Sequence, residues 1–311
     1  MDILNAIKEK VDIIRKRSDK IDLSDLLLHL ERAEFYFQQG RESQDDNYFT
    51  DVIYRTNQAF EGGLREVYNV QAKKGRRNIK THEIEKYLLD NNILKSRVLD
   101  FFTHYRQNWR NESAHNYRLS FNESEALMAI MTVSSFSYVL INQILETLAF
   151  QIESTIDIDK KELERIIADK DTEIDEKIVS LIKLFYSQNS DLIKKENYSE
   201  LEIIGLFTGF LNTTTKGLKI QQEVKLDLKR DFLRPDLVFE LGGEKVIMEF
   251  KRNRIKKNID TSRTQMIKYL FSTEIKNGVI FYFNKDDHKE LKVEKNILTD
   301  YDLTFTIMEI Y

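Results

Sequence analysis

The sequence contains no cysteine and a single proline, Pro235, among 311 residues. A chain without cysteine cannot form disulfides, bind zinc through thiolates or use a thiol nucleophile, and it fits a reducing compartment. No stretch approaches the roughly 18 uninterrupted apolar residues of a membrane span, and charged residues begin at Asp2. We therefore expect a cytoplasmic protein with neither a signal peptide nor a membrane-spanning helix.

The chain also lacks an excess of positive charge, because its net charge is −4. This balance argues against a protein that coats nucleic acid through its overall charge. The local distribution differs, since a basic cluster lies in the second half at Lys251, Arg252, Arg254, Lys256 and Lys257. Such clusters are often solvated surfaces, so this one is a candidate binding surface only if reactive groups lie beside it.

Apolar residues recur three and four positions apart through the first half of the chain, a spacing typical of amphipathic helices. The predicted helices cover residues 3–14, 23–39, 48–70, 82–109 and 122–150. The last of them is rich in Met, Ile, Val, Phe and Leu and should be mostly buried. The sequence thus predicts an α-helical bundle over residues 1–150.

The pattern changes after residue 150. Residues 151–197 are strongly charged and predict a helical connector, which could be an exposed spacer or could pack on either domain. The elements that follow are a helix at 198–211, a strand at 218–226, two strands within 235–251, a helix at 260–275, and strands at 278–284 and 303–310. This order predicts a second, α/β domain over residues 198–311 with a mixed central sheet, and the chain is long enough for two domains.

Two alternating runs in the second domain, 235–241 and 244–251, flank Gly242 and Gly243. A two-residue glycine loop between such runs is typical of a β-hairpin, because both turn residues need positive φ. The predicted pairs are Leu241 with Glu244, Glu240 with Lys245, Val238 with Ile247 and Asp236 with Glu249. One face of this hairpin is then almost wholly apolar, and the other carries the charged residues.

The register places two carboxylates opposite each other, with Cβ atoms roughly 5 Å apart, which is destabilising unless a positive charge lies between them. Mg²⁺ or Mn²⁺ would supply that charge, since Mg²⁺ prefers hard oxygen ligands. Lys251 points to the same face and could orient or deprotonate a metal-bound water. The adjacent basic cluster then becomes a candidate nucleic-acid contact, and Arg252 and Arg254 are its expected substrate-binding residues.

Pro235-Asp236, followed on the next strand by Glu249-x-Lys251, resembles the motif of the PD-(D/E)XK nuclease superfamily. The resemblance implies a restriction-endonuclease-like α/β fold and metal-assisted hydrolysis of phosphodiester bonds. It implies that Asp236, Glu249 and the Phe250 carbonyl bind Mg²⁺ or Mn²⁺. Lys251 would position the attacking hydroxide and stabilise the charge that develops at phosphorus.

Two helices extend this resemblance. Members of the superfamily often add a glutamate from the helix before the hairpin, so either Glu200 or Glu202 could join the metal ligands. Both also lie in the first turn of a predicted helix, where glutamate is favourable for structural reasons alone. Gln265 and Tyr269 lie four apart on one helix face. They resemble the Gln-x-x-x-Tyr element of the RecB-like branch, which implies contact with the substrate near the scissile phosphate.

The helical half carries a second motif in the stretch WRNESAHNY. Arg110 is followed by Asn111 and precedes His115 by five positions, and Tyr117 lies two beyond the histidine. This pattern resembles the Arg-x(4–6)-His motif of HEPN domains, helical bundles that dimerise to bring two motifs together. The resemblance implies a metal-independent ribonuclease site, with His115 as general acid/base, Arg110 on the phosphate, and Asn111 and Tyr117 contacting the substrate.

Three readings remain open. The leading one is a metal-dependent nuclease, acting on DNA, whose helical domain forms a homodimer and could also cut RNA. The second is a HEPN ribonuclease toxin whose nuclease-like domain binds nucleic acid, and the third is a non-catalytic, dimeric nucleic-acid-binding regulator. Family association suggests a role in prokaryotic anti-phage defence, with a regulatory or antitoxin protein as a further partner.

Overall fold

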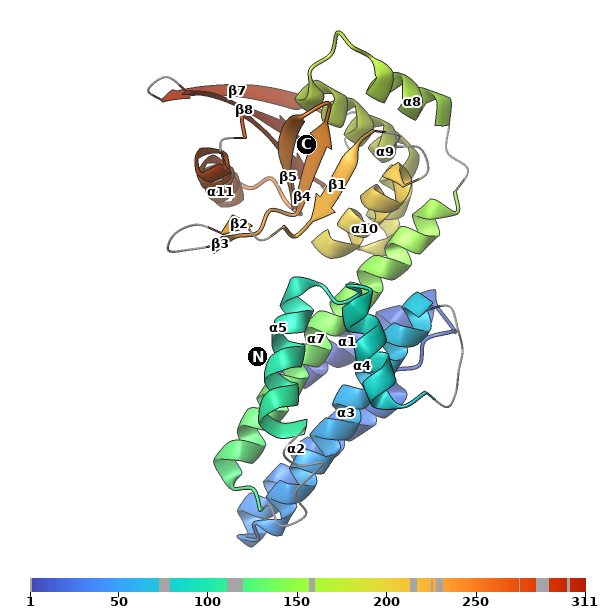
Figure 1. The fold of residues 1–311 in the computed structure, drawn as a ribbon, viewed down its shortest axis with the longest axis vertical. Helices are drawn as coiled ribbons and strands as arrows, with labels where there is room; N and C mark the ends of the chain where they lie inside the picture. The colour runs from blue at the N-terminus through green and yellow to red at the C-terminus, as the bar shows by residue number, and fades with distance from the viewer. Residues whose placement is uncertain are drawn as a thin grey trace. The chain divides into compact units, whose positions relative to one another are not determined.

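The computed structural model describes residues 2–72, 79–110, 120–156, 160–212, 217–224, 226–227, 232–273, 275–283, 291–300 and 303–311. The chain divides into two compact units, Met1–Leu145 and Glu146–Tyr311. The first unit is helical in its described residues, and the second combines helices with a sheet (Figure 1). The prediction of an α part followed by an α/β part is confirmed at this level.

The helices of the first unit follow the apolar spacing of the sequence. They are α1 (Ile3–Arg17), α2 (Ser24–Ser43), α3 (Asn47–Ala72), α4 (Thr81–Asp90), α5 (Ser96–Tyr105), the π-helix η1 (Arg106–Arg110) and α7 (Glu123–Ser154). Helix α1 is representative, because Ile7, Val11 and Ile14 are fully buried along one face. Asp2 caps it by accepting the backbone N–H groups of Leu4 and Asn5, as an N-cap aspartate does.

One predicted helix of this unit was wrong. The segment 82–109, expected as continuous, is divided into α4, α5 and η1. The break begins at Asn91 and Asn92, and Asn92 adopts a φ of 51°. Asparagine enters this left-handed region more readily than most residues, and it ends a helix there. The apolar spacing continues across the break, which is why periodicity alone predicted one helix.

Helix α7 is long and apolar enough, by length and composition, to cross a membrane. Within its most apolar window, 56% of the residues are buried inside the protein. The buried residues include Val133, Phe136 and Leu140, each fully enclosed. This burial is typical of the core helix of a soluble protein, in agreement with the expectation from the sequence.

The second unit is built on a six-stranded sheet. Its strand order is β1-β4-β5-β6-β8-β7, formed by β1 (Lys219–Gln222), β4 (Leu237–Leu241), β5 (Glu244–Lys251), β6 (Asn277–Tyr282), β8 (Leu303–Ile310) and β7 (Val293–Asp300). Strand β5 pairs antiparallel with β4 and parallel with β6, and β6 is parallel to β8. The predicted mixed sheet is therefore confirmed. A separate pair joins β2 (Leu226–Asp227) to β3 (Phe232–Leu233).

Helices cover both faces of this sheet (Figure 1). On one face, Phe239 and Phe250 pack with residues of α9 (Ile174–Glu196) and α10 (Glu200–Leu211). On the other, Val238 and Ile247 pack with residues of α11 (Lys256–Thr273). The sheet is thus the middle of three layers, and charged side chains on the α11 face lie within the protein rather than on an open surface.

The charged segment 151–197 belongs to the second unit. Its described residues include the end of α7 and then form α8 (Lys160–Ala168) and α9. Ile178, Ile182 and Phe185 of α9 are buried in the same cluster as the apolar side of the sheet. The sequence left open whether this segment is exposed or packed, and the structure places α9 in the core of the α/β unit.

Candidate functional site

The hairpin has the register that the sequence predicts. The two glycines have positive φ values of 61° and 92°, and Leu241 pairs with Glu244. The ladder ends at Leu237 and Met248, so Asp236 and Glu249 follow directly in the same register. Glu249 shares its face with Ile247, because side chains alternate along a strand. The carboxylates therefore lie on the side covered by α11.

Hydrogen bonds join the residues of this site. The backbone N–H of Asp236 donates to Oε1 of Glu249 at 3.2 Å, and the N–H of Phe250 donates to Oδ2 of Asp236 at 2.9 Å. Nζ of Lys251 donates to Oε2 of Glu249 at 2.7 Å, forming an ion pair with a carboxylate side chain that is only 2% exposed. The structure thus brings Asp236, Glu249 and Lys251 into one bonded group.

The backbone carbonyl of Phe250 points toward the same place. The N–H and C=O groups of one strand residue leave the strand on the same side. The N–H of Phe250 donates to Asp236, whereas the carbonyl of the next residue, Lys251, accepts from Phe283 on the opposite side. The Phe250 carbonyl consequently faces the edge of β5 that carries Asp236.

Negative charge at this site is not balanced. Burial, and then the neighbouring charge of Glu249, raise the pKa of Asp236 to about 7. Burial lowers the pKa of Lys251, but the charges of Glu249 and Asp236 outweigh it and leave that pKa raised above its ordinary value. One ammonium therefore faces two close carboxylates, and Asp236 becomes hard to ionise as a result.

The two glutamates of α10 have different surroundings. Glu200 raises the pKa values of both Asp236 and Lys251 through its charge, and its Oε1 accepts the backbone N–H of Arg252 at 3.2 Å. Glu202 is buried, and its Oε2 accepts the N–H and Oγ–H of Ser199 at 2.9 and 2.7 Å in a capping box. The structure thus places Glu200 at the carboxylate pair and Glu202 in the helix cap.

This difference gives a paired prediction. Glu202→Ala should lower the free energy of unfolding by about 1 kcal/mol, because it removes half of a capping box. Glu200→Ala removes one hydrogen bond of a half-buried side chain and should cost less, about 0.5 kcal/mol, but it should weaken the stabilisation that Mg²⁺ gives. Urea unfolding of both variants with and without Mg²⁺ measures the two effects, and the opposite assignment would exchange their results.

Gln265 and Tyr269 lie at the same site. Nε2 of Gln265 donates to the hydroxyl of Tyr269 at 2.6 Å, and this hydroxyl donates to the carbonyl of Arg234 at 3.2 Å. Burial, and then the charge of Glu249, raise the pKa of Tyr269. The tyrosine therefore remains a neutral hydrogen-bond donor beside the carboxylates. The structure thus brings this predicted pair close to the hairpin. The pair comes from α11, whose position does not follow from the hairpin turn.

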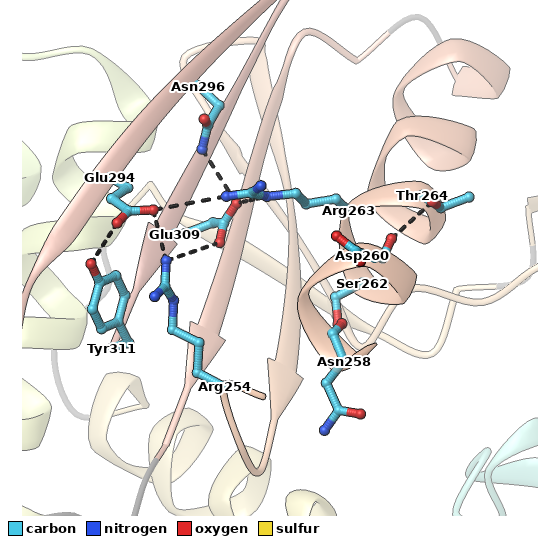
Figure 2. Close-up of polar contacts among 10 residues, drawn as sticks. All are labelled: Arg254, Asn258, Asp260, Ser262, Arg263, Thr264, Glu294, Asn296, Glu309 and Tyr311. Carbon is cyan, nitrogen blue, oxygen red and sulfur yellow. Dashed lines mark hydrogen bonds and ion pairs between the residues drawn. The ribbon is translucent and has the colours of Figure 1, made fainter. Parts of the chain in front are cut away.

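The two predicted substrate-binding arginines differ in their contacts. Arg252 is exposed and donates to the carbonyl and side-chain oxygens of Asn197. Arg254 points into a network on the sheet, where its NH2 group lies 2.7 Å from Glu294 and 3.9 Å from the fully buried Glu309 (Figure 2). Its guanidinium also lies 3.5 Å from the centroid of the Tyr311 ring. Arg254 thus acts first as an internal partner of β7 and β8.

Sequence reasoning missed this network. Arg263 of α11 pairs with Glu309 through its Nε and with Glu294 at 3.8 Å, and the Tyr311 hydroxyl donates to Glu294 at 2.6 Å (Figure 2). One signal was present, because Glu309 interrupts an otherwise apolar strand and a buried carboxylate needs a partner. The identity of that partner depends on the packing of α11 and could not be read from spacing.

The second predicted motif lies mostly outside the described residues. Asn111, His115 and Tyr117 are not among them, and for Arg110 only the backbone is described, at the end of η1. The π-helix ends at Arg110, the first residue of the motif. Helices of this type are rare and are often found at functional sites.

Hard oxygen donors make the carboxylate pair suitable for a magnesium-like ion. Asp236, Glu249 and the Phe250 carbonyl offer such donors, and Glu200 adds a nearby negative charge. Within the described ranges no three acidic or histidine side chains converge tightly enough to bind a metal by themselves. Mg²⁺ is commonly bound by one or two carboxylates, with waters and substrate phosphate as its other ligands, so the donor set fits.

Comparison of the chain with family models, with curated proteins and with solved structures found no match in any of the three. The two family resemblances therefore remain predictions from the motifs, and the site must be interpreted through its own geometry.

Proposed function

We propose that the second unit is a metal-dependent nuclease that hydrolyses phosphodiester bonds of DNA, on a restriction-endonuclease-like fold. The observation that carries this proposal is the hydrogen-bonded group of Asp236, buried Glu249 and Lys251, in which burial and then the charge of Glu249 raise the pKa of Asp236 to about 7. Two carboxylates held together at the end of the β4–β5 pairing cost stability, and structures tend to keep such strain at functional sites. A divalent cation between them would remove the cost.

Asp236, Glu249 and the Phe250 carbonyl would hold Mg²⁺ or Mn²⁺, with Glu200 as the nearest additional carboxylate. When bound, the cation supplies charge neutralisation and Lewis-acid activation. Lys251 is fixed by Glu249, so its ammonium can donate to a phosphate oxygen as negative charge develops during attack by water. Tyr269 and Gln265 add neutral donors on the same side.

The charges around the site favour a nucleic acid as the substrate, and the choice of DNA follows from the resemblance to the nuclease superfamily. Arg252, Lys256 and Lys257 are exposed within six residues of Lys251 along the chain. Exposed cations near a carboxylate site suit a polyanion, because they can contact its phosphates while one phosphate lies at the site. A cytoplasmic location, a role in defence and a homodimer through the helical unit remain predictions that follow from the resemblance.

The test is a cleavage panel of DNA and RNA substrates with Mg²⁺, Mn²⁺ or EDTA. We expect DNA cleavage that EDTA abolishes. Lys251→Ala should slow it by roughly 10²- to 10³-fold, the usual effect of removing one group that stabilises transition-state charge. Lys245→Ala is the matched control, because Lys245 is exposed at the other end of the same strand. Tight DNA binding without cleavage under any metal condition would favour the non-catalytic regulator.

A second activity, metal-independent RNA cleavage by His115, is favoured by the π-helix that ends at Arg110. The same panel tests it. RNA cleavage that persists in EDTA and stops in His115→Ala would assign that activity to the helical unit. The metal-dependent activity would then be assessed from the cleavage of DNA substrates alone.

A further inference from the structure

The loop between β5 and α11 displays an apolar side chain four residues after Lys251. Ile255 is 58% exposed. Its carbonyl accepts the N–H groups of Asn258 and Ile259, so it occupies the N-cap position of α11. Isoleucine is among the least favourable N-cap residues, since it has no oxygen to accept an orphan N–H. Ile255 thus departs from local preference in its position at the start of the helix, and such departures are expected at functional residues.

The loop holding Ile255 is fixed on both sides. Its first residue, Arg252, donates its N–H to Glu200 and its side chain to Asn197. After the isoleucine, Nδ2 of Asn258 donates back to the carbonyl of Asn253 at 3.1 Å. These bonds connect the loop to the start of α10, which itself carries a residue of the site.

The neighbouring Arg254 provides the strongest attachment. Its guanidinium lies among Glu294, Glu309 and Tyr311, and Arg263 ties the same carboxylates to α11 (Figure 2). Because Glu309 is fully buried, this network cannot rearrange without leaving a charge without its partner. The backbone at Arg254 is therefore held firmly, and the adjacent Ile255 is presented in one place.

The surroundings of Ile255 indicate what it contacts. Arg252, Lys256 and Lys257 are exposed and lie within three residues of it along the chain, and Lys251 of the carboxylate site lies four residues before it. The cations suit phosphates, whereas the isoleucine suits an apolar surface that comes with them. Nucleic-acid bases supply that surface once they are unstacked, and apolar side chains of this kind separate base steps in duplex DNA.

We infer that Ile255 is a wedge that contacts an unstacked base of a DNA duplex next to the scissile phosphate. This inference rests on the proposed nuclease function and adds to it a substrate class, a duplex that is locally opened. The pinned loop supplies the rigidity that a wedge needs, since a mobile side chain would yield rather than separate the bases.

Binding to a duplex that carries 2-aminopurine tests the wedge without cleavage, using Ca²⁺ in place of Mg²⁺. Wild-type protein should raise the fluorescence of a probe near the binding site, because 2-aminopurine brightens when it unstacks. Ile255→Ser should lose this rise, and Ile255→Leu should keep it. Ile297→Ser is the matched control, because Ile297 is 63% exposed on β7 of the same unit.

Two further measurements separate a wedge from a structural residue. Ile255→Ser should lower kcat/KM on duplex DNA by about tenfold, the scale of losing one contact to a base, and should affect single-stranded DNA much less. It should also raise the Tm by roughly 2–4 °C, because serine is a good N-cap. A structural role predicts the reverse, a lower Tm with equal effects on both substrates.

The outcomes distinguish this inference from the nuclease proposal. Cleavage of DNA with no fluorescence change in wild type would overturn the wedge and leave the nuclease intact. A fluorescence rise that needs Ile255, without cleavage under any metal condition, would support the wedge and overturn the nuclease. Equal fluorescence in wild type and Ile255→Ser would overturn the wedge in either case.

Discussion

Asp236→Asn is expected to abolish metal-dependent DNA cleavage and, in the same protein, to increase stability at alkaline pH. The amide oxygen is neutral and therefore a much weaker ligand for a divalent cation than a carboxylate, so we expect a loss of cleavage of about 10³-fold or more, as when a catalytic group is removed. The amide oxygen can still accept the N–H of Phe250, which bonds to Asp236 at 2.9 Å. The fold should therefore be retained.

The stability gain follows from the raised pKa of Asp236, about 7 when no metal is bound. A carboxyl group whose pKa is higher in the folded than in the unfolded chain binds its proton more tightly when folded. Stability is then lost as pH rises from the unfolded pKa of about 4 toward 7. The amide of the variant has no such proton to lose, so Asp236→Asn should exceed wild type at pH 8 by on the order of 3 kcal/mol and approach it at pH 4.

Urea unfolding in EDTA at several pH values measures this difference. Asp260→Asn is the control, because Asp260 is exposed on α11. Mg²⁺ should stabilise wild type at pH 8 and have a much smaller effect on Asp236→Asn, since a ligand stabilises only the state that binds it. An unchanged pH dependence in Asp236→Asn would show that this carboxyl does not carry the strain on which the proposed site depends.

Gly205→Ala is expected to destabilise the second unit by about 3 kcal/mol, at the upper end of the usual cost of overpacking. A Cβ atom at Gly205 would lie 2.3 Å from the carbonyl oxygen of Glu146 in α7. One turn later, a Cβ at Gly209 would lie 2.6 Å from the carbonyl oxygen of Phe150. Both obstacles are backbone atoms, so the helices α7 and α10 would have to move apart.

Gly62→Ala is the control for this prediction. A Cβ there meets nothing within 4 Å, and the residue lies inside α3. Alanine in a helix interior is favoured over glycine by up to about 1 kcal/mol, so this variant should be slightly more stable than wild type. Thermal and urea unfolding of the two variants measure the expected loss of stability in Gly205→Ala and the expected gain in Gly62→Ala. A Gly205→Ala protein as stable as wild type would mean that α7 and α10 are not packed this closely.

The hairpin was predictable because several local rules agree there. Two adjacent glycines fix the turn, and the period of two along each strand fixes which residues share a face. The observed pairs of Leu241 with Glu244 and Val238 with Ile247 follow from these rules alone. The strand at 303–310 was likewise found with its observed bounds, since its first half alternates apolar residues with Thr304 and Thr306.

Other features depend on distant parts of the chain. Strand β7 was not predicted, because its sequence alternates weakly and carries Glu294, Lys295 and Asp300. The acidic partners of Arg254 lie on β7 and β8, about 40 and 55 residues further along the chain. Residue spacing does not predict contacts over such distances. For the same reason the sequence did not predict the internal contacts of Arg254, and it left the packing of α9 undecided.

The close packing of α7 on α10 also bears on how the two units can be separated for study. Helix α7 continues from the first unit, which ends at Leu145, to Ser154 in the second. A truncation that begins at residue 151, where the composition changes, would remove Glu146 and Phe150, the residues against which Gly205 and Gly209 pack. The α10 helix that carries Glu200 would lose its support. A soluble fragment of the second unit should instead start upstream of Glu146.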